Sequence, residues 1–286
     1  MPDNLFEIDA TSIDAKAINA AYYGDGAFIV RRLLPTNLIK AVVLQLIELV
    51  GLLDDTVPSA CPISASDDAV KAASWMLQEV ERRDPGSHSV IYDAIAHTPL
   101  MHQISTCTEL MQVLHQFLSP HLMIHPRLIV LMSMPKATWH LARWHQDYYY
   151  NKGPKSTCTL YAPLQYTDAR NGGLIIAKKQ LALGQADYGS HDYGAPTKWN
   201  TLPQKVVDKF DNKAQIEMYP GDVLLMHSLT PHNAQVNETD DVRFVINLRY
   251  RDMLDAEFLA NKWRVDDTQE ARQALERKNP LEKTAP

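Results

Sequence analysis

The stretch YPGDVLLMHSLTPHNAQVNETDDVRFVINLRY, residues 219–250, decides the fold. Pro220, Gly221 and Asp222 have the composition of a turn, and VLLMH at 223–227 has that of a short strand. A polar connection, NAQVNETDD, then leads to a second apolar run at 242–250. Two such runs joined by a polar connection indicate a β-sheet core in this part of the chain.

Similar runs of Leu, Ile, Val, Thr and Tyr, each bounded by turn residues, precede this stretch. They are HLMIHPRLIVLMSM (121–134), STCTLYAPLQYT (156–167), GGLIIA (172–177) and AQIEM (214–218). Before residue 120 the periodicity is mostly helical, as in PTNLIKAVVLQLIELVGLL (35–53), which opens with proline and carries apolar residues at helical spacing. A short strand at 27–34 and a loop at 54–64 interrupt this helical part.

The chain is predicted to form one domain. No glycine-, serine- or proline-rich linker stands near residue 120, so we assign residues 1–286 to a single domain. Within it, residues 1–120 form mostly helical support, residues 121–252 form a β-sandwich or barrel core, and residues 253–286 form a polar C-terminal tail. The predicted fold class is therefore mainly β with helices packed on the outside.

Composition and charge narrow the function classes. Hydrophobic residues make up 45% of the 286 residues and charged residues 22%, as in a folded soluble protein. The net charge of -6 gives no basic field for phosphate groups, so we expect no nucleic acid partner. The acidic start lacks a secretory signal, and Lys40, Gln45 and Glu48 interrupt the apolar run at 38–53. We therefore expect no membrane association and a cytoplasmic location.

The segment RWHQDYYYNKGP, residues 143–154, places His145 two positions before Asp147. Side chains at i and i+2 of a strand point to the same face, so an imidazole and a carboxylate there can bind one metal ion. A 2-His-1-carboxylate iron site needs a second histidine and leaves positions open for a co-substrate and O2. Because the chain has eleven histidines, the pair alone is a weak signal, and both His227 and His232 are candidates for the missing ligand.

Arg243 lies eleven positions after His232, in the apolar run at 242–250. A guanidinium on a strand inside a barrel suits a bidentate ion pair with a carboxylate. The alternative is a surface ion pair with Asp240 or Asp241, which would contribute little to stability.

Together these residues resemble a known pattern. His145-Gln146-Asp147, His232 and Arg243 are similar to the H-x-D…H…R pattern of the phytanoyl-CoA dioxygenase family of Fe(II)/2-oxoglutarate-dependent oxygenases. The segments YYGDGAFIVRRLLP (22–35) and APLQYTDARNGGLIIA (162–177) resemble the family's opening strand and its core strand with the following turn. The likeness extends over residues 15 to 250.

The resemblance implies a double-stranded β-helix, the jelly roll of cupin-like proteins, with an N-terminal helical region. It also implies that His145, Asp147 and His232 bind Fe(II) and that Arg243 binds the C5 carboxylate of 2-oxoglutarate. Gln146 and Tyr161 would line the co-substrate pocket. With O2 as second co-substrate, such an enzyme hydroxylates an unactivated C–H bond of a small-molecule substrate and releases succinate and CO2.

The sequence departs from the family pattern at two places. Ala234 stands where many relatives have a serine or threonine that helps to hold the C5 carboxylate, and a PGSH segment common after the NG-x-L turn is absent. Related halogenases lack the carboxylate ligand, so the retained Asp147 favours hydroxylation over halogenation. Desaturation and ring chemistry remain open outcomes.

Two other function classes stay open from the sequence. A jelly-roll protein can keep the fold and bind ligands without turnover, and zinc accepts the same His/Asp/His ligands in a hydrolase. No motif specifies the substrate. Four lysines near the predicted site would attract an anionic substrate or simply form a solvated surface: Lys152, Lys155, Lys178 and Lys179.

Overall fold

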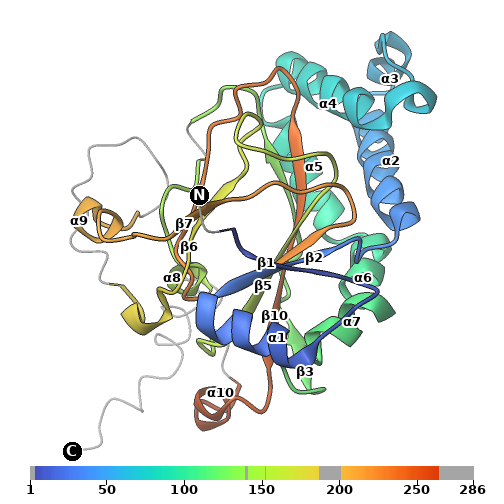
Figure 1. Ribbon diagram of the computed structural model, residues 1–286. Coiled ribbons are helices and arrows are strands. Elements are labelled where there is room, and N and C mark those ends of the chain that lie inside the picture. Colours follow the sequence, from blue (N-terminus) through green and yellow to red (C-terminus); the bar gives the residue numbers. More distant parts are fainter. Residues whose placement is uncertain (1–3, 139–140, 152, 187–200, 264–286) are drawn as a thin grey trace, which may run out of the picture.

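Two β-sheets pack face to face, and a layer of helices covers the outer face of the larger sheet (Figure 1). The computed structural model describes residues 4–138, 141–151, 153–186 and 201–263. This arrangement confirms the predicted class, a jelly-roll core with packed helices. The predicted polar tail, residues 253–286, is described as far as residue 263 and includes one short helix, α10 (Ala256–Ala260).

The large sheet has seven strands, six of which follow the order β1-β2-β8-β5-β10-β3. Their bounds are β1 Phe6–Asp9, β2 Ala27–Arg31, β8 Val223–His227, β5 Cys158–Pro163, β10 Arg243–Asp252 and β3 Leu122–Ile124. The seventh strand, β4 (Ile129–Ser133), pairs with the first half of β10, and β3 pairs with its second half. The small sheet has the order β7 (Lys213–Gln215), β6 (Leu174–Ala177), β9 (His232–Ala234).

The side chains of β10 alternate between the two faces of the large sheet. Its even-numbered residues face the helices in the larger hydrophobic core: Phe244, Ile246, Leu248 and Tyr250. Val245, in contrast, packs with Leu174 of the small sheet in a second core. Because side chains alternate along a strand, Arg243 and Arg249 share the face of Val245 and point into the space between the sheets.

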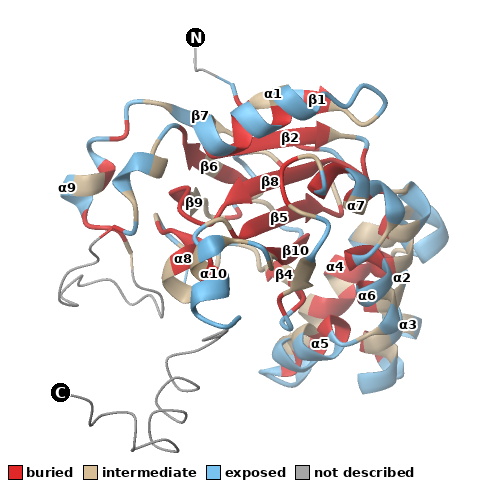
Figure 2. Cartoon of the chain, turned by 90° about the horizontal axis from the view of Figure 1, so that it is seen from below, coloured by how far each residue is buried: buried red, intermediate tan, exposed pale blue. Residues whose placement is uncertain are grey.

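The helices of the N-terminal part are α1 Ala15–Ala20 with the π-turn η1 Ala21–Asp25, α2 Thr36–Leu53, α3 Thr56–Ala60, α4 Ala65–Arg83, α5 Ser87–Ala96, α6 Pro99–Ser105 and α7 Thr108–Leu114. Figure 2 shows α2 to α6 together as an outer layer on one side of the buried strands, and α1 along β1 and β2. Three short helical segments lie among or after the later strands: α8 Asp147–Tyr150, η2 Leu181–Leu183 and α9 Gln204–Val207. The helices of the outer layer cover the outer face of the large sheet. A site can therefore form only on its inner face, between the two sheets.

Helix α2 is long and apolar enough to cross a membrane by length and composition alone. Its buried residues recur at helical spacing and pack in the larger core: Ile39, Val42, Val43, Leu46 and Val50. The helix contacts α4 and α5. This one-sided burial is the pattern of a helix that packs on a protein core.

Local signals set several helix starts. The side chain of Asp14 accepts hydrogen bonds from the first turn of α1, and Ser64 caps α4 in the same way. Helix α4 also has Asp67 in its first turn and Arg83 in its last, which complements the helix dipole.

The structure differs from the predicted elements in short segments. Helix α3 lies inside the predicted loop at 54–64, and strands β1 and β9 were not expected. The segment around His145 is not a regular strand: it makes a single β-bridge and then turns into α8. These elements have three to five residues each. The strands β1 and β9 form by pairing with distant segments more than through their own composition, whereas α3 packs beside α2 and α4.

Candidate metal centre

Three side chains from remote parts of the chain converge between the sheets. His145, Asp147 and His232 each offer a ligand atom, and these atoms lie within 4.8 Å of one another. The Oδ1 atom of Asp147 is 3.6 Å from Nε2 of His145 and 3.9 Å from Nε2 of His232. All three residues are at least nine-tenths buried. The structure thus brings together the three residues that the sequence predicted as ligands.

A backbone bridge holds the two histidines side by side. The amide of each residue donates to the carbonyl of the other at 3.0 Å, which pairs the segment before α8 with β9. The two imidazole rings are 4.2 Å apart at their centroids. Gln146 is extended and Asp147 begins α8, so the chain bends just after the bridge. The carboxylate therefore reaches the histidines by a turn of the backbone, and not by the strand alternation that we had assumed.

The outer ring nitrogens fix the tautomers of both histidines. Nδ1 of His145 lies 2.6 Å from the carbonyl oxygen of Arg143, and Nδ1 of His232 lies 3.0 Å from that of Thr230. A carbonyl only accepts hydrogen bonds, so each Nδ1 carries the hydrogen and each Nε2 presents its lone pair to the centre. Burial lowers the pKa of His232 to about 4, which keeps its ring neutral at physiological pH.

Asp147 carries the negative charge of the centre. Burial by itself would raise the pKa of its carboxyl group, but the Arg249 guanidinium and the two histidines together outweigh burial, and the pKa lies well below its usual value. Its Oδ2 atom accepts a hydrogen bond from Thr159 at 2.6 Å and one from Nε of Arg249 at 3.3 Å. Two imidazoles and one carboxylate facing a common point are the donor set of a non-haem iron site.

Arg243 is buried in the same interior and has no carboxylate partner among the described residues. Its Nη1 donates to the Tyr161 hydroxyl at 2.8 Å and to the Gly172 carbonyl, and its Nη2 donates to the Ser133 hydroxyl at 2.5 Å. Its Nε atom has no hydrogen-bond partner in the part of the chain that the structure describes. Arg243 is 2% exposed, so the alternative of a surface ion pair is wrong. A buried cation with an unused donor is suited to an anionic ligand.

Strand β5 extends from the candidate metal ligands to Arg243. Thr159 contacts Asp147 and Tyr161 contacts Arg243, and these two residues are i and i+2 on one face of the strand. Tyr161 thus lies beside Arg243, in the region where the sequence predicted the co-substrate pocket. Arg243 and the three candidate metal ligands are thus connected through the same strand.

Gln146 lies next to the candidate ligands, but its amide is used by backbone groups. Nε2 donates to the carbonyls of Gly184 and Leu229 at 2.8 Å each, and Oε1 accepts from the amide of Ala186 at 2.9 Å. These contacts tie the segment after η2 to the centre. The direct contact with 2-oxoglutarate that we expected of Gln146 stays a prediction.

The other histidine candidate lies apart from this centre. His227 is at the end of β8, packs beside the rings of Tyr22 and Tyr23 at 5.3 and 6.2 Å, and accepts a hydrogen bond at Nδ1 from Leu229. Burial lowers its pKa to about 4. His227 is a core histidine.

The predicted lysines do not form one cluster. Lys178 is buried and donates to the carbonyl of Asn4, whereas Lys155 pairs with Glu257 and Lys179 pairs with Asp25. Lys152 lies outside the described residues.

Sequence reasoning missed three residues of the interior: Thr159, Ser133 and Arg249. Arg249 could have been found, because it lies six positions after Arg243 on a predicted strand and so shares its face.

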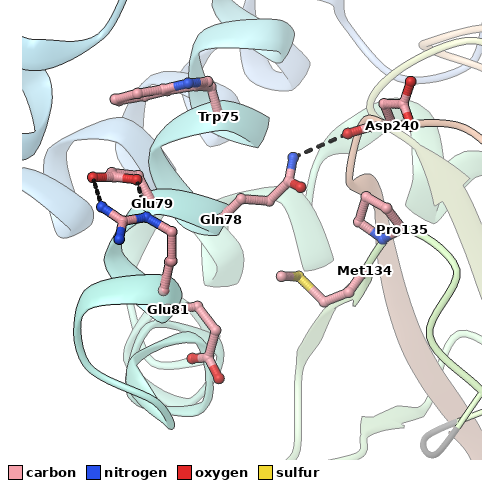
Figure 3. Close-up of a pocket in the computed structure, with 8 residues that line it drawn as sticks. Trp75, Gln78, Glu79, Glu81, Met134, Pro135 and Asp240 are labelled. Atoms are coloured by element: carbon pink, nitrogen blue, oxygen red, sulfur yellow. Dashed lines mark hydrogen bonds and ion pairs between the residues drawn. The ribbon is translucent and has the colours of Figure 1, made fainter.

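A groove on the outer surface contains none of these residues (Figure 3). Trp75, Gln78, Glu79, Glu81 and Arg82 of α4 line it, together with Met134, Pro135 and Asp240. Gln78 crosses it and donates to the carbonyl of Asp240 at 3.1 Å. Close by, the buried hydroxyl of Ser74 accepts a hydrogen bond from the amide of Val242 at 2.8 Å. Helix α4 thereby fixes the turn that leads into Arg243.

The chain matches a known family and known folds. A model of the family "Phytanoyl-CoA dioxygenase (PhyH)" matches residues 22–245. Among solved structures, the chain is similar to the epimerase SnoN in complex with Fe3+, alpha ketoglutarate and nogalamycin RO, with 16% identity, a TM-score of 0.56 and 83% of each chain covered.

Two further structures are similar at the same level. The carbocyclase SnoK from nogalamycin biosynthesis has 16% identity and a TM-score of 0.53, over 86% of this chain and 87% of SnoK. EctD from S. alaskensis, solved with 2-oxoglutarate and 5-hydroxyectoine, has 15% identity and a TM-score of 0.57, over 85% of this chain and 77% of EctD. At such identities these similarities establish a shared fold.

Proposed function

Because the chain belongs to the phytanoyl-CoA dioxygenase family of iron- and 2-oxoglutarate-dependent oxygenases, we propose that it hydroxylates an unactivated C–H bond of a small-molecule substrate. The observation that carries this proposal is one buried interior with two complementary parts. One part is the donor set of His145, Asp147 and His232, and the other is Arg243, a buried cation without a carboxylate partner among the described residues.

In the proposed enzyme, His145, Asp147 and His232 hold the iron through Nε2, Oδ1 and Nε2. When bound, iron and 2-oxoglutarate supply the oxidising chemistry, in which O2 converts 2-oxoglutarate to succinate and CO2 and one oxygen atom goes to the substrate. The chain's part is to present Nε2 of each histidine and to keep the carboxylate ionised. The carbonyls behind the two histidines fix their tautomers, and the Arg249 guanidinium beside Asp147 favours the ionised carboxylate.

Arg243 is the proposed partner of the C5 carboxylate. Its contacts with Tyr161 and Ser133 hold the guanidinium plane in place, and its Nε remains available. The hydroxyl of Ser133, which accepts from Nη2 of Arg243, would support that carboxylate in the proposed complex and so compensate for Ala234. A co-substrate held at its far end has lost its rotational freedom before reaction.

The surrounding core keeps water away from the reacting groups. The wall of the interior is apolar, with Ile176 of the small sheet facing Leu224 and Val245 of the large sheet. The three proposed ligands are each at most 7% exposed. Such exclusion protects a strongly oxidising centre from side reactions.

Hydroxylation is favoured over halogenation because Asp147 occupies the carboxylate position. The fold alone does not select among other outcomes, since SnoN is an epimerase and SnoK a carbocyclase. The test is to supply the Fe(II)-loaded protein with 2-oxoglutarate, O2 and a panel of amino acids, acyl thioesters, phosphonates and terpenoid acids. Succinate and the mass of each product are then measured.

The proposal expects at least one compound to stimulate succinate formation and to gain one oxygen atom. A product without added oxygen would reject hydroxylation but keep the oxygenase class. Turnover with zinc in place of iron would instead indicate a hydrolase. A protein that consumes no O2 with any compound, although loaded with Fe(II) and 2-oxoglutarate, would be a binding protein.

A further inference from the structure

The two oxygens of Asp147 have different surroundings. Oδ1 faces Nε2 of His145 and Nε2 of His232, whereas Oδ2 points away from them and accepts two hydrogen bonds. We propose that Thr159 and Arg249 are positioning residues that hold Asp147 as a ligand through one oxygen only. This inference rests on the proposed function, because it concerns the carboxylate assigned to the iron.

The two donors lie next to each other in the interior of the large sheet. Thr159 and Arg249 are direct cross-strand partners on β5 and β10, two neighbouring strands that each have a partner on both sides. Both residues are buried, at 1% and 8% exposed. Thr159 is β-branched, which restricts the rotation of its hydroxyl-bearing carbon. Asp147, in contrast, begins a helix of four residues between loops.

The contacts are strong ones for a carboxylate. The Thr159 hydroxyl lies 2.6 Å from Oδ2, a length typical of a hydrogen bond to an ionised group. Arg249 adds a cation 3.3 Å from the same atom. Because Oδ2 is bonded on two sides, only Oδ1 remains for a metal ion. A carboxylate that binds through one oxygen leaves a further position free for 2-oxoglutarate or O2.

Thr159 separates position from charge more cleanly than Arg249 does. As a positive charge, Arg249 repels a metal cation but also favours the ionised form of Asp147, so the two effects of its charge oppose each other. If Arg249 holds the ligand in place, its removal weakens binding, as loss of the groups behind metal ligands usually does. Thr159 carries no charge, so the Thr159→Val variant reports on position alone.

The experiment measures binding of Mn(II) alone, without co-substrate, from the electron paramagnetic resonance signal of the free ion. The variants are Thr159→Val, Thr159→Ser and Arg249→Met, with Arg82→Met as the matched control. Arg82 pairs with Glu79 on the surface of α4 and is remote from the centre in sequence and fold. We expect Thr159→Val and Arg249→Met to bind Mn(II) about 10- to 100-fold more weakly, and Thr159→Ser and Arg82→Met to bind like the wild type.

A second measurement distinguishes a changed coordination by Asp147 from a general loss of structure. In the Co(II)-loaded protein, the ligand-field absorption depends on the number of coordinated oxygens. We expect the wild type and Thr159→Ser to share one spectrum and Thr159→Val to show another. Circular dichroism and thermal unfolding of the metal-free variants check the fold, and the Thr159→Val and Thr159→Ser pair decides the question if Arg249→Met does not fold.

Unchanged or tighter Mn(II) binding by folded Thr159→Val and Arg249→Met would overturn the inference and leave the proposed function intact. Equal loss of binding in Thr159→Val and Thr159→Ser would also overturn it, because the hydroxyl would then not be the cause. Absence of Mn(II) binding by the wild type would reject both the inference and the proposed metal centre.

Discussion

The guanidinium of Arg243 lies against the hydroxyl of Tyr161, with Nη1 2.8 Å from the phenolic oxygen, in the buried space between the two sheets. The phenolic oxygen accepts this hydrogen bond, so the hydroxyl hydrogen stays available to donate to a bound carboxylate. Burial raises the pKa of Tyr161, which keeps it protonated. Arg243 and Tyr161 together are the proposed binding pair for the C5 carboxylate of 2-oxoglutarate.

The first prediction concerns this pair. Replacing Tyr161 by Phe removes one hydrogen bond to a charged group, which costs about 1.5 to 3 kcal/mol. We expect the KM for 2-oxoglutarate to rise about tenfold or more, with a smaller effect on kcat. Initial rates of succinate formation over a range of 2-oxoglutarate concentrations measure both constants. An unchanged KM would show that the co-substrate does not contact this pair.

The second prediction concerns Ser133, whose hydroxyl lies 2.5 Å from Nη2 of Arg243. We expect Ser133→Ala to raise the KM for 2-oxoglutarate, because the guanidinium loses a buried contact that orients it. The matched control is Ser59→Ala, since Ser59 is exposed and its hydroxyl donates only to the carbonyl of Thr56. Equal constants for the two variants in the succinate assay would contradict a role for Ser133.

The third prediction concerns the anchor of β10. Ser74 is fully buried on α4, and its hydroxyl accepts from the amide of Val242, the residue before Arg243. Ser74→Ala leaves this amide without its partner, so we expect the free energy of unfolding to fall by about 1 to 3 kcal/mol. Urea unfolding followed by circular dichroism measures the loss. A fall no larger than that of Ser59→Ala would mean that the contact does not stabilise the fold.

The fourth prediction concerns pH and His227. Burial lowers the pKa of His227 from 6.5 to about 4, although Asp255 opposes the shift. Between these values the unfolded chain binds a proton that the folded chain does not, so the contribution to stability is complete above pH 6.5 and falls as the pH drops towards 4. At about 1.4 kcal/mol per unit, the loss from this group amounts to about 3 kcal/mol.

The His227→Gln variant tests this effect. Glutamine does not titrate, and its side-chain oxygen can accept the hydrogen bond that Leu229 gives to His227. We expect unfolding free energies of the wild type to fall more steeply than those of His227→Gln from pH 7 to pH 4.5. If the unfolding free energies of the two proteins fell with pH at the same rate, protonation of His227 would not contribute to the loss of stability.

The sequence predicted the strands with long apolar runs, but not those defined by tertiary pairing. Strand β10 was expected because its apolar residues repeat over the whole run, and the family pattern placed Arg243 on it. Strand β9, with residues His232, Asn233 and Ala234, has no such signal and exists because it pairs with β6. Its pairing also brings His232 to His145, a contact that spacing along the chain does not reveal.

The site residues that follow a spacing along the chain could be predicted, and those that depend on strand pairing could not. The H-x-D spacing and the offset from His232 to Arg243 follow the chain and could be recognised, whereas Ser133 and Thr159 act through the register of neighbouring strands. Arg243 pairs with Ser133 across the sheet, and Arg249 pairs with Thr159. A single sequence does not specify which residues of two strands lie opposite each other.

In the proposed metal centre, His145, Asp147 and His232 hold one ferrous ion, and His227 does not. Anaerobic titration of Fe(II) into the wild type, His145→Ala, Asp147→Ala, His232→Ala and His227→Gln measures this binding. We predict that the wild type and His227→Gln bind one Fe(II) per chain with similar affinity and that each of the other variants loses this binding. Retained binding in folded His232→Ala, or its loss in folded His227→Gln, would contradict the account.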